Sequence, residues 1–199
     1  MARVLVACEF SGAVRSAFRA SGHDAWSCDL LPAEDGGPHI QGDVRDVLGD
    51  GWDLMIAHPP CTHLAVSGAR HFHKKQKEQA AALEFVRTLL EAPIPRICLE
   101  NPVSVISTKI RKPTQIVQPY HFGHPESKKT CLWLVNLPAL RATNVMIDRG
   151  RWENQTPSGQ NKLGPSPDRW KIRSKTYPGI ASAMAVQWGE LLGGSHGTD

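Results

Sequence analysis

Two short segments of the chain carry residues that can perform covalent chemistry together. Residues 58–63 read His-Pro-Pro-Cys-Thr-His behind an apolar run at 54–57, and Glu100-Asn101-Pro102 follows a second apolar run at 97–99. The two proline rings fix the backbone before Cys61, so its sulfur loses little entropy when it is held in one position. A thiol and an acid delivered to the same sheet edge predict nucleophilic attack on an electron-poor ring, with the acid handling the proton.

Cys61 and the histidines around it also allow two other interpretations. A lone cysteine in a reduced protein is often an inert, structural thiol. A metal site is the second alternative, because four histidines lie close in the sequence, at positions 58, 63, 71 and 73. Their spacing matches neither paired Cys-x-x-Cys nor helical His-x-x-x-His, so we expect no metal.

A second group of residues lies where a nucleotide-like cofactor binds in an open α/β sheet. Phe10-Ser11-Gly12 follows a strand expected at 4–7, Asp29 follows the strand at 26–28, and Asp43 lies in Gly42-Asp43-Val44. Ligands of such sheets bind at the carboxyl ends of the strands, so Asp29 is placed for ribose hydroxyls and Asp43 for an adenine amine. The turn lacks the G-x-G-x-x-G pattern of dinucleotide sites. Each acid, taken singly, equally fits a turn or a helix cap.

Composition places few restrictions on the function. The chain has 199 residues, 41% of them hydrophobic and 21% charged, with a net charge of +4 and a pI near 8.9. This length predicts a single domain, residues 1–199, and no apolar stretch reaches the roughly 20 residues of a membrane span. The start of the chain reads as a strand and not as a signal peptide, and five widely spaced cysteines predict reduced thiols. We expect a cytoplasmic protein.

Hydrophobic periodicity predicts strands that alternate with helices. The expected fold is therefore an open, largely parallel twisted sheet flanked by helices, an α/β architecture. Residues 31–42 and most of the chain after 140 read as loops. The expected strands are 4–7, 26–28, 52–57, 96–99, 116–118 and 131–135, with a short element at 42–44, and the expected helices are 13–20, 74–91 and 180–192.

The order of these motifs resembles the DNA (cytosine-5) methyltransferases. Phe10-Ser11-Gly12 is similar to the first cofactor motif of that family, Pro59-Pro60-Cys61 to the nucleophile motif and Glu100-Asn101-Pro102 to its Glu-Asn-Val partner. Residues 122–130 resemble the family's Phe-Gly-x-Pro-Gln-x-Arg-x-Arg stretch, and residues 179–192 its closing helix. The resemblance spans nearly the whole chain, in the family's order.

The resemblance implies a Rossmann-like methyltransferase fold and transfer of a methyl group from S-adenosylmethionine to carbon 5 of cytosine in DNA. Cys61 would add to carbon 6 of the ring, Glu100 would bind N3 and the exocyclic amine, and Lys128 would hold the O2 or phosphate side and help depress the pKa of the thiol. The target base would be flipped out of a duplex or lie in a single strand. The residues implied to bind the cofactor are Phe10, Ser11, Gly12, Asp29, Asp43, Pro59 and Ile180.

The chain departs from the family pattern in several places. Ala13, Val14 and Arg15 replace the later glycines of the first motif, and Ile180 stands where the family usually has Asn. Glu126, Lys128 and Thr130 replace Gln, Arg and Arg, and Lys lacks the planar fork of Arg. The usual large target-recognition domain is missing, which predicts a short or relaxed sequence preference.

The segment 136–175 is the remnant of that domain. It is rich in Gly, Pro and basic residues, with Trp152 and Trp170 between them, a composition that suits a loop tracking phosphates and stacking on bases. The residues expected to bind DNA are Lys129, Arg169, Lys171 and Arg173; Arg149, Arg151 and Lys162 add charge, against Asp148, Glu153 and Asp168. A solvated surface loop is the alternative.

At the level of function, two alternatives also remain open. The protein could modify a free cytidine nucleotide or RNA, or it could be an inactive DNA-binding or anti-restriction protein. The oligomeric state is not predicted.

Overall fold

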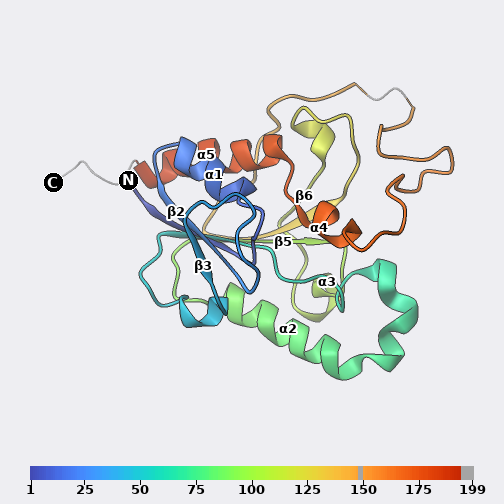
Figure 1. Ribbon diagram of the computed structural model, residues 1–199, viewed down its shortest axis with the longest axis horizontal. Helices are drawn as coiled ribbons and strands as arrows, with labels where there is room; N and C mark the ends of the chain where they lie inside the picture. The colour runs from blue at the N-terminus through green and yellow to red at the C-terminus, as the bar shows by residue number, and fades with distance from the viewer. Residues whose placement is uncertain (148–149, 194–199) are drawn as a thin grey trace.

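A seven-stranded sheet forms the centre of the molecule (Figure 1). The computed structural model describes residues 1–147 and 150–193, so Asp148 and Arg149 lie outside the described residues, as do the side chains of residues 70 and 71. The strand order is β3-β2-β1-β4-β5-β7-β6, and only the pairings of β7 are antiparallel. The strands are β1 (Arg3–Ala7), β2 (Asp24–Asp29), β3 (His39–Gln41), β4 (Leu54–Ala57), β5 (Ile97–Pro102), β6 (Gln115–Val117) and β7 (Thr130–Val135).

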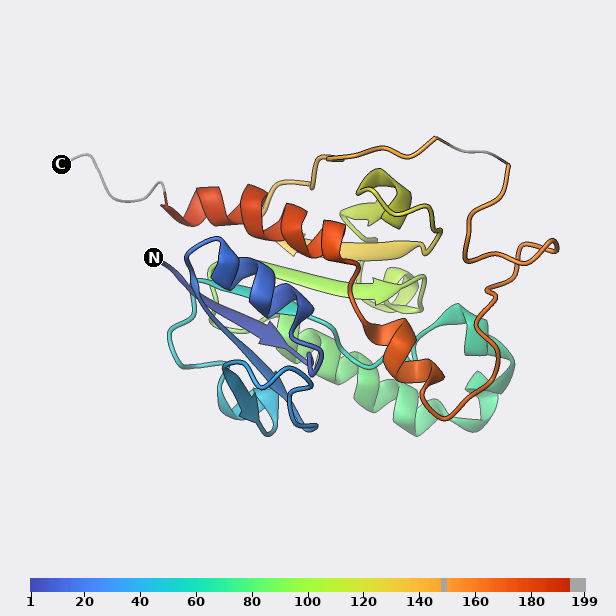
Figure 2. The ribbon, with the colours of Figure 1, turned by 45° about the horizontal axis from the view of Figure 1, so that its top comes forward.

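Helices cover both faces of the sheet. Helices α1 (Ala13–Ala20) and α5 (Pro178–Gly193) lie together on one face, while α2 (Gln76–Leu90) and α3 (Ile106–Lys109) lie on the other (Figures 1 and 2). The short α4 (Arg169–Ser174) lies beyond the strand ends, beside the start of α5. The remaining helical segments are the 3-10 turns η1 (Val44–Asp46), η2 (Val66–Lys74) and η3 (Pro119–His121). The expected α/β fold, an open and largely parallel sheet flanked by helices, is confirmed.

Two apolar clusters, one on each face, hold the layers together. The strands are buried on both sides, which explains why β1 and β4 read as continuous apolar runs and not as alternating ones. On the first face, Trp188 of α5 and Phe18 of α1 pack against Val4 and Val6 of β1. On the second face, Leu89 of α2 packs in the cluster that contains Trp133 of β7.

Most expected elements are present, with several differences. The predicted loop 31–42 contains β3, and the expected element at 42–44 is instead a turn that leads into η1. The strand expected at 96–99 continues to Pro102, so Glu100 and Asn101 are strand residues. The long helix begins at Gln76 and not at Lys74, because η2 occupies residues 66–74. The short helix α4 lies in a segment expected to be a loop, and α3 lies in a segment for which no element was predicted; at six and four residues they are too short for periodicity to reveal.

Within the described part of the chain, no helix has both the length and the apolar character needed to cross a bilayer.

Candidate active site and nucleic-acid interface

The carboxyl ends of five parallel strands bring most of the expected site residues to one edge of the sheet. In the order of the sheet, this edge carries Asp43 after β3, Asp29 at the end of β2, Phe10 after β1, Pro59 after β4 and Glu100 in β5. Because β1 lies between β2 and β4, the cofactor motif is flanked by Asp29 on one side and by the cysteine loop on the other. The sheet therefore gathers residues that are up to 90 positions apart in the sequence.

Hydrogen bonds fasten the cysteine loop to both neighbouring strands. The amide of His58 donates to the Ala7 carbonyl of β1 at 2.9 Å, and the side-chain amide of Asn101 donates to the Pro59 carbonyl at 2.9 Å. Asn101 is almost fully buried, so this bond is shielded from water. Beyond the prolines, the Cys61 carbonyl accepts from the amides of Leu64 and Ala65. The loop is thus held at both ends, and Cys61 lies on it as an exposed residue.

Glu100 is a nearly buried carboxylate with a histidine partner. Nδ1 of His58 donates to Oε2 of Glu100 at 3.1 Å, and the two side chains are only 9% and 14% exposed. Burial alone raises the pKa of Glu100, but the hydrogen bond from His58 and the charges of Lys128 and His58 outweigh it and hold the pKa below its usual value. Glu100 is therefore ionised at neutral pH in the free protein.

The Cys61 thiol is not activated in the free protein. Partial removal of its sulfur from water and the negative charge of Glu100 raise its pKa, while Lys128 and Arg173 lower it by less. The expected effect of Lys128 on the thiol is present in direction, but it does not decide the net pKa. Thiolate formation is consequently opposed first by burial of the sulfur and second by the charge of Glu100.

The turn after β1 is built around a buried acid, Glu9. Its carboxylate accepts from the amides of Val14 at 2.7 Å and Arg15 at 3.2 Å, so it fills the N-terminus of α1. Gly12 adopts a left-handed conformation, with φ of 73°, where the chain turns into the helix. A pyrophosphate would need the amides that Glu9 occupies, so the turn fits a cofactor without one.

The two acids expected to bind the cofactor, Asp29 and Asp43, differ in the hydrogen bonds and ion pairs that they already form. Asp29 accepts one backbone hydrogen bond, from Leu31 at 2.9 Å. Asp43 pairs with the Arg45 guanidinium and caps η1, and the hydrogen bonds from Arg45 lower its pKa to about 2. Both acids are thus available as acceptors of hydrogen bonds, Asp29 more freely. Ile180, by contrast, is buried in the core on the inner side of α5.

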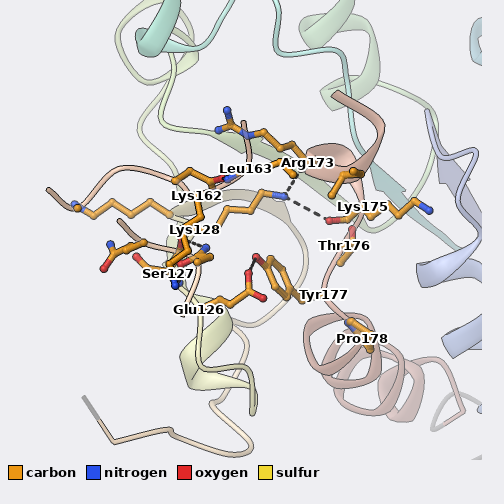
Figure 3. Close-up of a pocket in the computed structure, with 16 residues that line it drawn as sticks. Glu126, Ser127, Lys128, Lys162, Leu163, Arg173, Lys175, Thr176, Tyr177 and Pro178 are labelled. Atoms are coloured by element: carbon orange, nitrogen blue, oxygen red, sulfur yellow. Dashed lines mark hydrogen bonds between the residues drawn. The ribbon is translucent and has the colours of Figure 1, made fainter. Parts of the chain in front are cut away.

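A basic cavity of about 770 Å³ opens between residues 126–129, 154–163 and 172–178 (Figure 3). Three lining cations, Lys129, Lys162 and Arg173, are exposed, and none of their side chains has an ion pair with a described residue. The ammonium of Lys128 donates to the carbonyls of Arg173 at 2.8 Å and Lys175 at 3.5 Å, as the dashed lines in Figure 3 show. To contact a base, the ammonium of Lys128 would have to give up its hydrogen bonds to these two carbonyls.

Helix α4 connects the basic cavity to the cofactor motif. Trp170 packs on Phe10 with ring centroids 5.7 Å apart, and just past the helix Lys175 pairs with Glu34 at 2.6 Å. Of the residues expected to bind DNA, the structure brings Lys129 and Arg173 together at the cavity. Arg169 and Lys171 lie on α4 but do not line the cavity.

Sequence reasoning did not identify the roles of His58 and Glu9. Both carried a signal: each lies directly behind a buried strand or one residue further on, at the same edge as the other candidates. The spacing of the histidines suggested His58 only as a metal ligand. The described residues contain no cluster of three or more His, Cys, Asp or Glu side chains arranged to hold a metal ion, and the side chain of His71 is not among them.

The chain is similar to solved structures, although no family model and no curated protein matches its sequence. The similarity to the Dnmt2 methyltransferase of S. pombe covers 70% of this chain, at 19% identity and a TM-score of 0.48. Two further structures are a protein described as a DNA modification methyltransferase encoded within a prophage of E. coli (67% covered, 15% identity, TM-score 0.44) and a mutant of DNMT2 from Spodoptera frugiperda (76%, 14%, 0.43).

The three similar proteins are all longer than this chain. The chain spans about half the length of each, 50%, 46% and 56% in the same order. At these identities the likeness concerns the fold, so the activity, substrate and partners of this chain depend on its own residues.

Proposed function

We propose that this protein is an S-adenosylmethionine-dependent methyltransferase that modifies carbon 5 of cytosine in DNA through a covalent adduct of Cys61. The observation that carries the proposal is the tie between the two chemical segments. Asn101 holds the Pro59 carbonyl and His58 holds Glu100, so the thiol loop and the acid are fixed side by side. This pair is what addition to an electron-poor ring requires.

The cofactor side of the site fits S-adenosylmethionine. Asp29 is placed for the ribose hydroxyls and Asp43 for the adenine amine, with Phe10, Ser11, Gly12 and Pro59 around them and Ile180 packing on the inner side of α5. The fit is supported by the N-terminus of α1, which Glu9 fills where a dinucleotide would place its pyrophosphate. When bound, S-adenosylmethionine supplies an electrophilic methyl group.

The residues of the chain activate and restore the base. Glu100 binds N3 and the exocyclic amine, and in the protonated form that donates to N3 it lacks the negative charge that raises the pKa of Cys61. The thiolate then adds to carbon 6, which makes carbon 5 nucleophilic. After carbon 5 has been substituted, loss of its proton and departure of the thiolate restore the aromatic ring. Base binding and thiol activation are thereby coupled through one carboxylate.

The basic cavity supports a polymeric substrate. Lys129, Lys162 and Arg173 form no ion pair with a described residue, although Glu126 also lines the cavity, and clustered cations bind phosphates with a strong dependence on salt. The target base must leave a duplex or already lie in a single strand to reach the buried Glu100. A free nucleotide offers fewer phosphates to this surface, which favours DNA or RNA over it.

The test is a covalent trap. DNA that contains 5-fluorocytosine should form an adduct with the protein that survives denaturing electrophoresis when S-adenosylmethionine is present, because the fluorine cannot leave as a proton does. Cys61→Ser should form no adduct, while Cys98→Ser, a change at a buried thiol in β5, serves as the matched control. An adduct only with 5-fluorocytosine RNA would move the substrate to RNA. No adduct with any substrate would exclude this mechanism.

A further inference from the structure

The contact between His58 and Glu100 bears on the proton that the base needs. An ionised carboxylate only accepts hydrogen bonds, so in this pair Nδ1 of His58 carries the hydrogen. The pKa of Glu100 lies below its usual value, and the carboxyl group therefore holds no proton of its own to give to N3 at neutral pH. A proton for N3 must arrive from elsewhere.

We infer that His58 and Glu100 form a proton-sharing dyad in which the protonated ring of His58 supplies the proton that Glu100 passes to N3 of the target cytosine. The inference rests on the proposed function and names a residue with a part in the same reaction. His58 does not touch the base; it acts through Glu100 and is a positioning and proton-supplying residue.

The surroundings of His58 fit this role. Its Nε2 is buried and has no hydrogen-bond partner among the described residues, so Glu100 is the one described partner of the ring. The ring is held from behind because the His58 amide donates to Ala7 of β1, and Asn101 fixes the next residue, Pro59. Only one oxygen of Glu100 is engaged by His58, which leaves the other for the base.

The step balances in protons and electrons. As the Cys61 sulfur bonds to carbon 6, the π pair of the C5–C6 bond moves to C4–C5, and the π pair of C4–N3 becomes a lone pair on N3. Nδ1 of the protonated imidazole first gives its proton to the Glu100 carboxylate, which leaves the ring neutral and the carboxyl protonated. The lone pair on N3 then takes this one proton from the carboxyl, and Glu100 is again an ionised carboxylate. When the thiolate later leaves and C5–C6 is double again, N3 returns the proton to the dyad. His58 is therefore unchanged over a full turnover.

The dyad also sets the direction of the pH dependence. Its proton must be present for addition, so turnover falls as the pH rises through the loss of that proton, while Cys61 needs a higher pH to ionise. The two requirements give a bell-shaped profile that belongs to the coupled site and not to one residue. The other ionisable groups that act on Glu100 or respond to its charge are Lys128 before β7, Cys61 on the loop, Cys98 in β5 and Cys131 in β7.

The experiment compares His58→Asn with His58→Ala and the parent protein, with kcat measured from pH 5.5 to 9. Asn offers a neutral side-chain N–H in place of Nδ1–H, so it can hold Glu100 but cannot supply a proton. We expect His58→Asn to keep the affinity for DNA, lower kcat at pH 7.5 about 100-fold and shift the alkaline limb of the profile to lower pH. Thermal unfolding of each variant reports on folding.

The outcomes separate the two proposals. If the parent forms the 5-fluorocytosine adduct and His58→Asn retains the parent's kcat and profile, a neutral hydrogen bond suffices and the dyad is overturned. The dyad is equally overturned if His58→Ala keeps the parent's profile. If the parent itself forms no adduct with DNA or RNA, the proposed function fails first, and the role of His58 with it.

Discussion

At the scale of single residues, Glu100 governs the site because the groups around it interact with its charge. His58 bonds to it, Lys128 acts on it from the segment before β7, and its carboxylate raises the pKa of Cys61. Burial of the sulfur and this charge both raise the pKa of the thiol, so a base that neutralises the carboxylate would remove one of the two causes.

Removal of the Glu100 charge should therefore activate the thiol. In Glu100→Gln, the pKa of Cys61 falls because a like charge is gone, so more thiolate is present at neutral pH. We expect iodoacetamide to alkylate Cys61 at pH 7.5 at least about threefold faster than in the parent. Cys61→Ser gives the background from other thiols, and Glu84→Gln, an exposed acid of α2, is the matched control. An unchanged rate would mean that Glu100 does not act on the sulfur.

Asp29 is the acid on which cofactor affinity should depend most. Among the described residues its carboxylate has one backbone partner and no ion pair, so Asp29→Ala removes acceptors for the ribose without disturbing an ion pair there. We expect the affinity for S-adenosylmethionine to weaken by about 1–3 kcal/mol in calorimetric titration. Asp50→Ala, at an exposed position before β4, should bind as the parent does. Equal affinity of both variants would place the cofactor elsewhere.

At the scale of elements, α4 is the piece that joins the two halves of the site. Trp170 contacts the cofactor motif through Phe10, while the carbonyl of Arg173 receives the Lys128 ammonium. The start of α5 is fixed in a similar way, because the Gly179 amide donates to Nε2 of His124 at 2.9 Å. A Cβ at Gly179 would lie 2.0 Å from the Phe122 carbonyl oxygen, so only glycine allows this approach.

The charges of α4 should bind phosphates. The combined change of Arg169, Lys171 and Arg173 to Ala is expected to weaken DNA binding in all sequences and to flatten its dependence on salt, by up to about three units of slope. Fluorescence anisotropy over a series of salt concentrations measures this. A control triple variant at Arg96, Lys109 and Lys112 removes the same charge from other elements. Equal effects in both variants would indicate net charge and not a binding surface.

At the scale of the whole molecule, one sheet carries the cofactor side and the chemical side of the site. The cofactor acids lie at the end of β2 and after β3, and the reacting groups lie after β4 and in β5, with β1 between the two sides. Both apolar clusters run across this division, so the two sides share a core. Binding at one side should consequently stabilise the whole unit.

Thermal unfolding should therefore show one transition that the cofactor moves upwards as a whole. At a concentration of S-adenosylmethionine 100 times its Kd, the gain in the free energy of unfolding is about 2.7 kcal/mol. Differential scanning calorimetry with and without the cofactor measures the shift, and Asp29→Ala at the same concentration should show less of it. Two transitions, of which only one moves, would contradict a single cooperative unit.

The sequence by itself determined the α/β architecture, the edge of the sheet at which the site lies and the candidate residues of the site. Continuous apolar runs predicted β1, β4 and β5, because burial on both faces leaves an unmistakable pattern, and the chemically able residues lie directly after these runs. The same pattern could not reveal β3 or α4, which are too short for periodicity to register.

Only the tertiary structure decided how the candidates interact. His58 bonds to Glu100, and Lys128 bonds to α4, between segments that are far apart in the sequence. Glu9 fills the N-terminus of α1 only because of the exact path of the turn between them. Charges act through distance and burial, and neither is written in local sequence. For that reason the sequence proposed Cys61 as a nucleophile, whereas only the structure shows that burial of its sulfur and the nearby charge of Glu100 raise the pKa of the thiol.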